Sequence, residues 1–191
     1  KSRDKRPPMT LRREKCFDQL ADALREFGKR RSLVEIVNTG NWGDALIHAG
    51  QKEFLRDNKI SVEQHSIAKL RKLGLGQVLQ LSRFSTRRAI ISGGGAWCDW
   101  YQRPQEMLRV CRFFSRTLVM PSSFTSLPPL NPRKVEFWRR DNAESFDKMS
   151  TSEFCHDLAF YLRPQERMPT KKRGLFFRDD AERAEFALPT G

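Results

Sequence analysis

Two glycine-bearing segments hold most of the residues that could do chemistry. Residues 38–44 read Asn-Thr-Gly-Asn-Trp-Gly-Asp, and a glycine triplet at residues 93–95 is followed by Asp99. Glycine has no Cβ, so backbone N–H groups can approach a phosphate closely, and a helix that starts after such a turn adds the positive end of its dipole. The segments therefore predict two glycine turns that hold a phosphate-bearing ligand. Neither fits G-x-G-x-x-G or G-x-x-x-x-G-K-[ST], which disfavours dinucleotide and P-loop sites, and the alternative is that the glycines only permit tight turns and close helix packing.

The candidate catalytic groups are two aspartates that follow these turns. Asp44 and Asp99 could both point into one crevice, where carboxyl groups would serve as general acid and general base. The alternative for Asp44 is a helix cap, because it stands where a helix begins and could accept that helix's own N–H groups. Asn38 and Asn41 are candidates for hydrogen bonds to a hydroxylated substrate, although asparagine in a turn commonly bonds its own backbone.

The candidate anion binders are arginines that follow predicted strands. Arg140 and Arg178 would lie at the sheet edge that carries the glycine turns, where a planar guanidinium suits a carboxylate or a phosphate. For Arg140, an ion pair with Asp141 or another neighbour is the competing interpretation. His48 and His156 are interpreted as structural. The full candidate substrate-binding set is Asn38, Asn41, Gly43, Gly93, Gly94, Gly95, Arg140 and Arg178.

A sheet must bring these residues together, and the chain alternates strand and helix patterns. We expect a leading helix over residues 11–27, strands over 33–37, 61–64, 88–92, 117–120 and 135–138, helices after Asp44 and over 67–81, 104–114 and 142–149, and a short element at 154–161. This alternation predicts an α/β fold, a parallel-sheet Rossmann-like layered domain with ligands at the carboxyl ends of its strands. We divide the chain into a basic arm with the leading helix (1–31), the α/β domain (32–162), a linker (163–173) and the start of a second domain (174–191).

The composition limits the classes of protein and of site. The 191 residues carry a net charge of +13, which implies affinity for polyanions such as nucleic acid, anionic lipid or a phosphorylated substrate. The cysteines are far apart and no histidine lies at metal-ligand spacing, so we expect reduced thiols and neither a zinc site nor a disulfide framework. No apolar run is long enough to span a bilayer, and the amino end lacks a secretory signal, so we expect a cytoplasmic protein.

Six short motifs stand in a definite order along the chain. They are residues 38–47, the glycine triplet with Asp99, residues 120–124 (Met-Pro-Ser-Ser-Phe), Arg140-Asp141 with Ser145, residues 156–160 (His-Asp-Leu-Ala-Phe) and residues 178–182 (Arg-Asp-Asp-Ala-Glu). Together they resemble the ordered signature of the polysaccharide pyruvyl transferases. The likeness covers about residues 33–185 and leaves out the basic first thirty residues.

The resemblance implies the first half of a glycosyltransferase B-type two-domain architecture. It also implies transfer of a pyruvyl group from phosphoenolpyruvate to a saccharide, with formation of a pyruvate ketal on an exopolysaccharide or cell-wall polysaccharide. Phosphoenolpyruvate would be a co-substrate, and no separate cofactor is implied. By similarity, Arg178 would hold phosphoenolpyruvate, and Asp44, Asp99 and the glycine triplet would line the site.

The same resemblance suggests partners and a place in the cell. The saccharide acceptor could be lipid-linked, and the basic amino arm could contact the inner face of an anionic membrane. We do not expect nucleic acid as a partner of such an enzyme. Family members carry a complete second domain, and this chain stops at Gly191 just inside it, so we expect weak turnover or none from these residues alone.

Two other classes of function stay open from the sequence. One is a non-catalytic basic α/β module that binds nucleic acid or anionic membrane, with binding that weakens steeply as salt rises. The other is a nucleotide-sugar glycosyltransferase half-domain, which would have the same layering but would retain a nucleotide diphosphate.

Overall fold

The computed structural model describes residues 11–29, 31–37, 40–67, 72, 87–98, 106–107, 109, 111–126 and 134–163. Within these ranges, no helix is both long enough and apolar enough to cross a membrane. The expected helix over 67–81 lies largely outside them, and only part of the one over 104–114 lies inside. The expected linker from residue 164 on and the expected second domain also lie outside the described residues.

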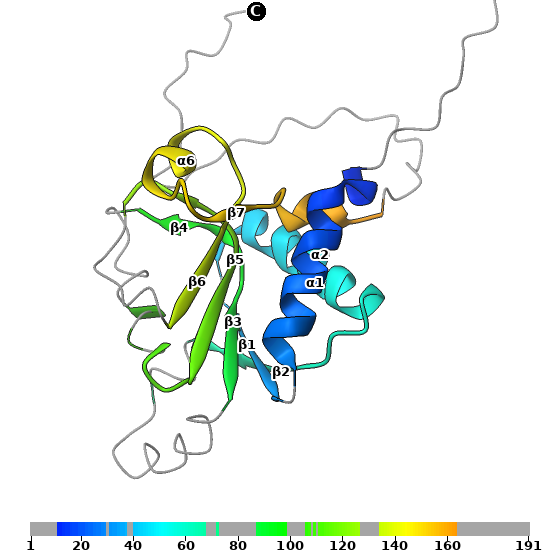
Figure 1. Cartoon of the computed structure of the whole chain (residues 1–191), viewed down its shortest axis with the longest axis vertical. Coiled ribbons are helices and arrows are strands. Elements are labelled where there is room, and N and C mark those ends of the chain that lie inside the picture. The colour runs from blue at the N-terminus through cyan, green and yellow to red at the C-terminus, as the bar shows by residue number, and fades with distance from the viewer. Residues whose placement is uncertain are drawn as a thin grey trace, which may run out of the picture.

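The centre of the fold is a parallel sheet in the order β2-β1-β3-β5-β6-β7, with β4 paired to β5 (Figure 1). Its strands are β1 (Leu33–Val37), β2 (Val62–Ser66), β3 (Arg88–Ile91), β4 (Gly94–Trp97), β5 (Arg116–Phe124), β6 (Val135–Arg139) and β7 (Glu153–Phe154). Every pairing among them is parallel. The predicted α/β Rossmann-like fold is therefore confirmed.

The strand order creates a switch point between β1 and β3. From β1 the chain passes to β2 on one side, and it then returns across β1 to place β3 on the other side. In open parallel sheets, a crevice forms outside the carboxyl ends of the strands at such a point, because the two connections leave in opposite directions. The predicted glycine segments follow β1 and β3, so they lie on the two sides of this switch point.

The prediction that a strand over 117–120 ends at Pro121 is wrong. β5 continues to Phe124. Its register with β6 shifts between Val119 and Ser122, across Pro121, and its pairing with β4 is irregular between Ser122 and Phe124. Proline has no N–H to donate to the ladder, and a bulge is one of the few places where an inner strand tolerates it. On one side β5 pairs first with β3 and then, beyond this irregularity, with β4.

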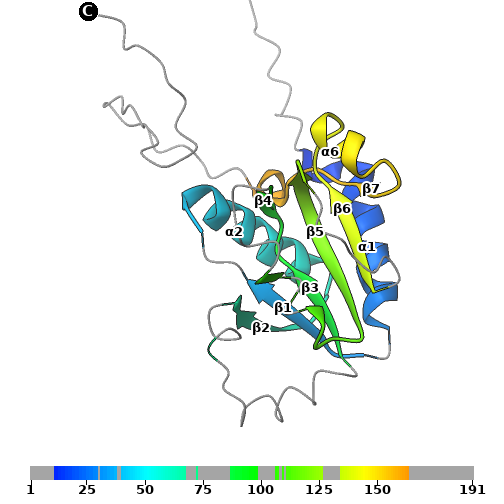
Figure 2. The same cartoon turned by 90° about the vertical axis from the view of Figure 1, so that its left-hand side faces the viewer.

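Two helices cover one face of the sheet (Figures 1 and 2). α1 (Lys15–Gly28) places Phe17, Leu20 and Leu24 fully inside, at the helical spacing that the sequence predicted. α2 (Trp42–Asp57) adds Phe54 to the same core. Burying each such side chain contributes about 1.5–3 kcal/mol, so this apolar face alone accounts for the position of both helices.

The opposite face has a second core of aromatic and aliphatic side chains. Trp97 and Phe124 are buried there, and the ring of Phe137 meets each of them edge-on with centroids 5.4 Å apart. Met107 and Cys111 reach this core from the helical residues that precede β5. The sheet is thus packed on both faces, as expected for parallel strands.

Short elements complete the carboxyl end of the described chain. The expected helix over 142–149 is the shorter α6 (Glu144–Lys148), and the expected element at 154–161 is β7 followed by a 3-10 turn, η3 (Leu158–Tyr161). Before α1 stands another 3-10 turn, η1 (Leu11–Arg13).

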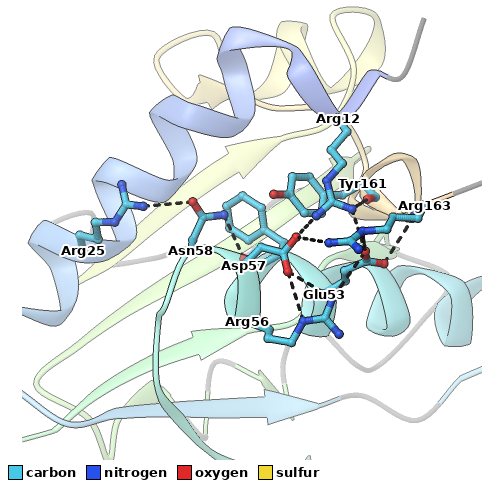
Figure 3. Close-up of polar contacts among 9 residues, drawn as sticks. Arg12, Arg25, Glu53, Arg56, Asp57, Asn58, Tyr161 and Arg163 are labelled. Carbon is cyan, nitrogen blue, oxygen red and sulfur yellow. Dashed lines mark hydrogen bonds and ion pairs between the residues drawn. The ribbon is translucent and has the colours of Figure 1, made fainter. Parts of the chain in front are cut away.

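A cluster of ion pairs joins η1 and α2 to the end of η3 (Figure 3). Arg12 donates to Glu53 at 2.7 Å, pairs with Asp57 and lies over the ring of Tyr161, 4.2 Å from its centroid. Arg163 reaches the same Glu53 at 2.9 Å. The hydrogen bond from Arg12 lowers the pKa of Glu53. This cluster therefore holds Arg163, the last described residue, against α2.

Candidate functional site

The first turn of α2 is closed by a capping box. Asn41 is the N-cap, and its side-chain Oδ1 accepts from the Asp44 N–H at 3.2 Å, while Asp44 Oδ2 accepts from the Asn41 N–H at 3.1 Å. The helix begins at Trp42, three residues earlier than predicted, so Asp44 is at the third helical position rather than ahead of the helix. The alternative reading of Asp44 as a capping group is borne out for one carboxylate oxygen, and the backbone role expected for Asn41 is borne out as well.

The second oxygen of Asp44 faces the next strand. A Cβ built on Gly94 would lie 3.3 Å from Asp44 Oδ1, so this oxygen lies beside the backbone of β4. A Cβ on Gly40 would come within 1.4 Å of Asp44 Oδ2, so a larger residue at that position would displace the carboxylate from the cap. Gly43 lies inside the first turn of α2, where helix N–H groups lack intrahelical acceptors.

The glycine triplet is not the turn before a helix that the sequence predicted. Gly93 links β3 to β4, and Gly94 and Gly95 are themselves strand residues. A Cβ on Gly93 would lie 2.5 Å from the carbonyl oxygen of Pro121, and Gly94 has φ of +151°, a conformation that other residues rarely adopt. The triplet therefore permits close approach of β4 to β5 and to α2, and no helix dipole follows it directly.

Arg140 stands at the other side of this glycine backbone. It follows β6, its Nε donates to Ser123 Oγ at 2.8 Å, and its Nη1 pairs with Asp157 at 2.5 Å. A Cβ on Gly95 would lie 3.4 Å from Arg140 Nη2, so the remaining guanidinium nitrogen faces β4. The prediction of an ion pair for Arg140 is confirmed, with Asp157 as the partner instead of Asp141.

Asp141 has a separate structural task. Its oxygens accept from the N–H and hydroxyl of Ser145, from the N–H of Ala143 and from the hydroxyl of Ser123. Burial would raise the pKa of Asp141, but these hydrogen bonds outweigh burial and hold the pKa below its usual value. Since Ser123 accepts from Arg140 and donates to Asp141, this cluster orients the guanidinium.

A buried carboxylate on β1, Glu35, was not among the predicted site residues. Glu35, in the middle of β1, accepts from Gln51 Nε2 at 2.7 Å and from Gln64 Nε2 at 3.1 Å. Burial raises the pKa of Glu35, and the two amide hydrogen bonds only partly oppose this effect. Gln51 Oε1 in turn accepts from the Gly93 N–H at 3.4 Å, so the buried network reaches the triplet. The signal was present in the sequence, because a glutamate interrupts the apolar run of β1.

We define the carboxyl-edge site as Asn41, Asp44, Gly94, Gly95 and Arg140. It lies at the switch point, with a carboxylate oxygen and a guanidinium nitrogen at the two ends of a side-chain-free backbone segment. Its chemistry is that of a proton donor or acceptor paired with an anion binder.

Three predicted site residues cannot be placed in it. Asn38, Asp99 and Arg178 lie outside the described residues. His156 packs among aromatic rings, with centroids 5.0 Å from Phe154 and 6.3 Å from Phe160, as its structural interpretation predicted. Among the residues that the structure describes, no group of acidic, histidine and cysteine side chains could hold a metal ion, and the four cysteines are free thiols.

Two apolar side chains beside the site are exposed. Trp42 opens α2 with 89% of its surface in water, and Leu46, one turn later, is 56% exposed. The neighbouring Ile47 is buried. Large exposed apolar groups commonly contact a ligand or a partner.

Comparison with known proteins supports the fold and no more. No protein-family model and no curated protein matches this chain. A solved structure of a functionally uncharacterised protein from Klebsiella pneumoniae is similar, with a TM-score of 0.63 and 21% identity over 75% of this chain. The match covers 56% of that protein, so the chain spans little more than half of its length.

Proposed function

We propose that this chain contributes the first domain of an enzyme that transfers a pyruvyl group from phosphoenolpyruvate to a saccharide and forms a pyruvate ketal. The observation that carries the proposal is that Asp44 Oδ1 lies beside Gly94 and Arg140 Nη2 lies beside Gly95, the next residue of β4. The six ordered sequence motifs support the same reaction. The proposal includes a glycosyltransferase B-type architecture, with a second domain that would close over this edge.

The reaction needs the two kinds of group that the carboxyl-edge site contains. A proton adds to the methylene carbon of phosphoenolpyruvate, and a first sugar hydroxyl bonds to the neighbouring carbon and loses its proton. A second hydroxyl then displaces phosphate from that carbon and loses its proton in turn. Asp44 would exchange these protons, and Arg140 would bind the phosphate or carboxylate of the donor.

Trp42 would form the acceptor side of the site. Its ring offers a broad apolar face with one N–H donor, a combination that suits the C–H face and hydroxyls of a sugar ring. Its exposure leaves that face open to a large acceptor. The acceptor would therefore meet α2, while the donor anion would meet Arg140.

The test is the reaction itself. The 191-residue chain and the product of its complete reading frame would be incubated with phosphoenolpyruvate and galactose-, glucose- and mannosamine-type acceptors, and phosphate release and acceptor mass would be followed. We expect a pyruvate ketal to form. Asp44→Asn should abolish its formation, because an amide cannot exchange protons as the carboxylate would. The variant should keep the helix cap, because the asparagine side-chain oxygen can still accept from the Asn41 N–H.

A matched arginine pair completes the test. Arg140→Ala should reduce turnover about 10²- to 10³-fold. Arg139→Ala should leave turnover unchanged, because Arg139 bonds Asn142 and Ser152. The proposal would be refuted if neither the 191-residue chain nor the product of the complete reading frame released phosphate or bound phosphoenolpyruvate. Retention of a nucleotide diphosphate in its place would favour a nucleotide-sugar glycosyltransferase.

A further inference from the structure

The edge of the sheet opposite the candidate site collects cationic side chains. Parallel strands start at one edge, so the residues before and at each strand start lie together. The described part of this edge has seven cationic residues, which lie just after α1 or at or just before the first residue of β3, β5 or β6. They are Lys29, Arg31, Arg87, Arg88, Arg112, Arg116 and Lys134. We name this set the amino-edge rim.

The rim has more positive than negative charge. Three carboxylates accompany it, with Glu26 paired to Lys29, Glu63 to Arg87 and Glu136 to Arg116. Arg88 and Arg116 are directly paired in the register of β3 and β5. Like charges that lie opposite each other destabilise a sheet, so the fold gains nothing from this arrangement by itself.

Local structural needs explain only part of the rim. Arg88 donates to the carbonyl oxygen of Phe27 and so satisfies the carboxyl end of α1. Lys134 and Arg112 are exposed, and neither makes an ion pair within the described residues. Exposed cations that gather at one edge suit an anionic partner from outside the domain.

The rim is hollowed and carries exposed aromatic surface. A cavity of about 570 Å³ opens between α1, β3, β5 and β6, and its lining is Ala23, Glu26, Phe27, Lys29, Arg88, Arg116 and Glu136. The guanidinium groups of Arg88 and Arg116 lie 5.4 Å and 5.6 Å from the centroid of the Phe27 ring. Beside the cavity's strands, Phe113 is 37% exposed in the turn before β5, next to Arg112.

We propose that the amino-edge rim docks the domain on an anionic phospholipid surface. Its cations would lie at the level of the lipid phosphates, and Phe113 would enter the interfacial layer, as aromatic side chains among cations do in interfacial proteins. Nucleic acid fits less well, because single strands are bound along a groove by several stacking rings, and Phe113 is the exposed ring that the described part of this edge offers.

Docking at this edge has a consequence for orientation. The carboxyl-edge site would face away from the lipid, at the far ends of the same strands. The inference does not depend on pyruvyl transfer, since it uses none of the residues of that site.

The test is binding of the full chain to vesicles. We expect it to float with vesicles of phosphatidylcholine and phosphatidylglycerol, and to leave them when the lipid is phosphatidylcholine alone or when salt is raised. Exchanging Arg31, Arg112 and Lys134 for glutamate should lower the partition coefficient by at least about tenfold. Phe113→Ser should lower it by a smaller factor and should leave the salt dependence unchanged.

A control with the same change in net charge separates the rim from the charge of the whole protein. Exchanging Arg13, Lys15 and Lys148 for glutamate should alter the partition coefficient by less than about twofold, because these residues are exposed outside the amino-edge rim. Circular dichroism melts would show whether the variants fold. If the variant with Arg31, Arg112 and Lys134 exchanged does not fold, Phe113→Ser tests the rim without charge reversal.

Two outcomes would overturn the proposal. The variant with Arg31, Arg112 and Lys134 exchanged could bind vesicles as tightly as the wild type, or both triple variants could lose vesicle binding equally. If the first outcome came with loss of binding to a single-stranded RNA oligomer, it would identify nucleic acid as the partner.

Discussion

At the carboxyl edge of the sheet, charged side chains are held by partners within the domain. Arg140 is bound by Ser123 and Asp157, and Asp44 by the backbone of Asn41. At the amino edge, cations outnumber carboxylates and two arginines are neighbours in register. At the carboxyl edge, therefore, a few charged groups have fixed orientations, whereas at the amino edge positive charge accumulates. The first arrangement suits chemistry on a small ligand, and the second suits adhesion to an extended anionic surface.

The largest expected effect is on turnover at the carboxyl edge. Arg140→Ala should reduce pyruvyl transfer about 10²- to 10³-fold, because it removes a fixed donor to the anionic donor substrate. Arg116→Ala at the amino edge removes an exposed pair with Glu136, so turnover should hold and stability should change by about 0–1 kcal/mol. Steady-state rates and urea unfolding check both, and equal loss of activity in the two variants would contradict the division of roles.

The next effect is on folding, and it should be specific to one glycine. Gly93→Ala should destabilise the domain by about 1–3 kcal/mol, since a methyl group would lie 2.5 Å from the Pro121 carbonyl oxygen. Gly95→Ala is the matched control, because its methyl group would meet only Arg140 Nη2 at 3.4 Å and the residue is exposed. Urea unfolding of the two variants compares them, and a smaller loss for Gly93→Ala than for Gly95→Ala would disprove the close approach of β4 to β5.

Exposed aromatic side chains should separate the two edges by their ligands. Trp42→Ala should raise the KM for the saccharide about tenfold and leave the KM for phosphoenolpyruvate unchanged, because it removes one apolar contact face. Phe113→Ala should leave both constants unchanged and weaken vesicle binding. If Trp42→Ala altered vesicle binding and Phe113→Ala altered the KM for the saccharide, the assignment of ligands to edges would be reversed.

The smallest expected effects are changes of stability with pH, which should have opposite signs for Glu35 and Asp141. The raised pKa of Glu35 means that its contribution to stability is full below the unfolded pKa of about 4.3 and is lost as pH rises through the folded pKa. Glu35→Gln should therefore gain stability relative to the wild type from acid to neutral pH. The lowered pKa of Asp141 has the reverse sign, so its contribution is present above about pH 3.9 and is lost as pH falls through the folded pKa.

Asp141→Asn should accordingly be most destabilising at neutral pH, and the difference from the wild type should close in acid. Urea unfolding across about pH 3–7 measures both variants. Parallel slopes for Glu35→Gln and Asp141→Asn would show that burial and hydrogen bonding do not act on the two carboxyls in opposite directions.

Much of the fold could be predicted because its signals are local. Phe17, Leu20 and Leu24 recur at helical spacing, and α1 buries them as expected. The apolar runs at residues 33–37 and 88–92 predicted strands, and β1 and β3 form there. Pro121 misled the prediction, because a residue that usually ends a strand is tolerated where a bulge already interrupts the ladder.

The site was predicted less completely because its contacts are long-range. The sequence indicated that Asp44 and the glycine triplet belong to one edge, and the structure places them in contact. It could not indicate that Asp157, rather than Asp141, would pair with Arg140, since that choice depends on how η3 folds back over the sheet edge. Glu35 was missed because a single acidic residue in an apolar run does not reveal the amides that will surround it.

The sequence by itself determined the types of element and the class of fold, because hydrophobic periodicity and turn residues act over a few neighbouring positions. Tertiary structure alone decided that a glycine triplet would join two strands, that one oxygen of Asp44 would cap a helix while the other faces β4, and that cations distant in sequence would gather at one edge. The physical reason is that register and strand order follow from the packing of the whole core, and no local pattern encodes which residues that packing will bring together.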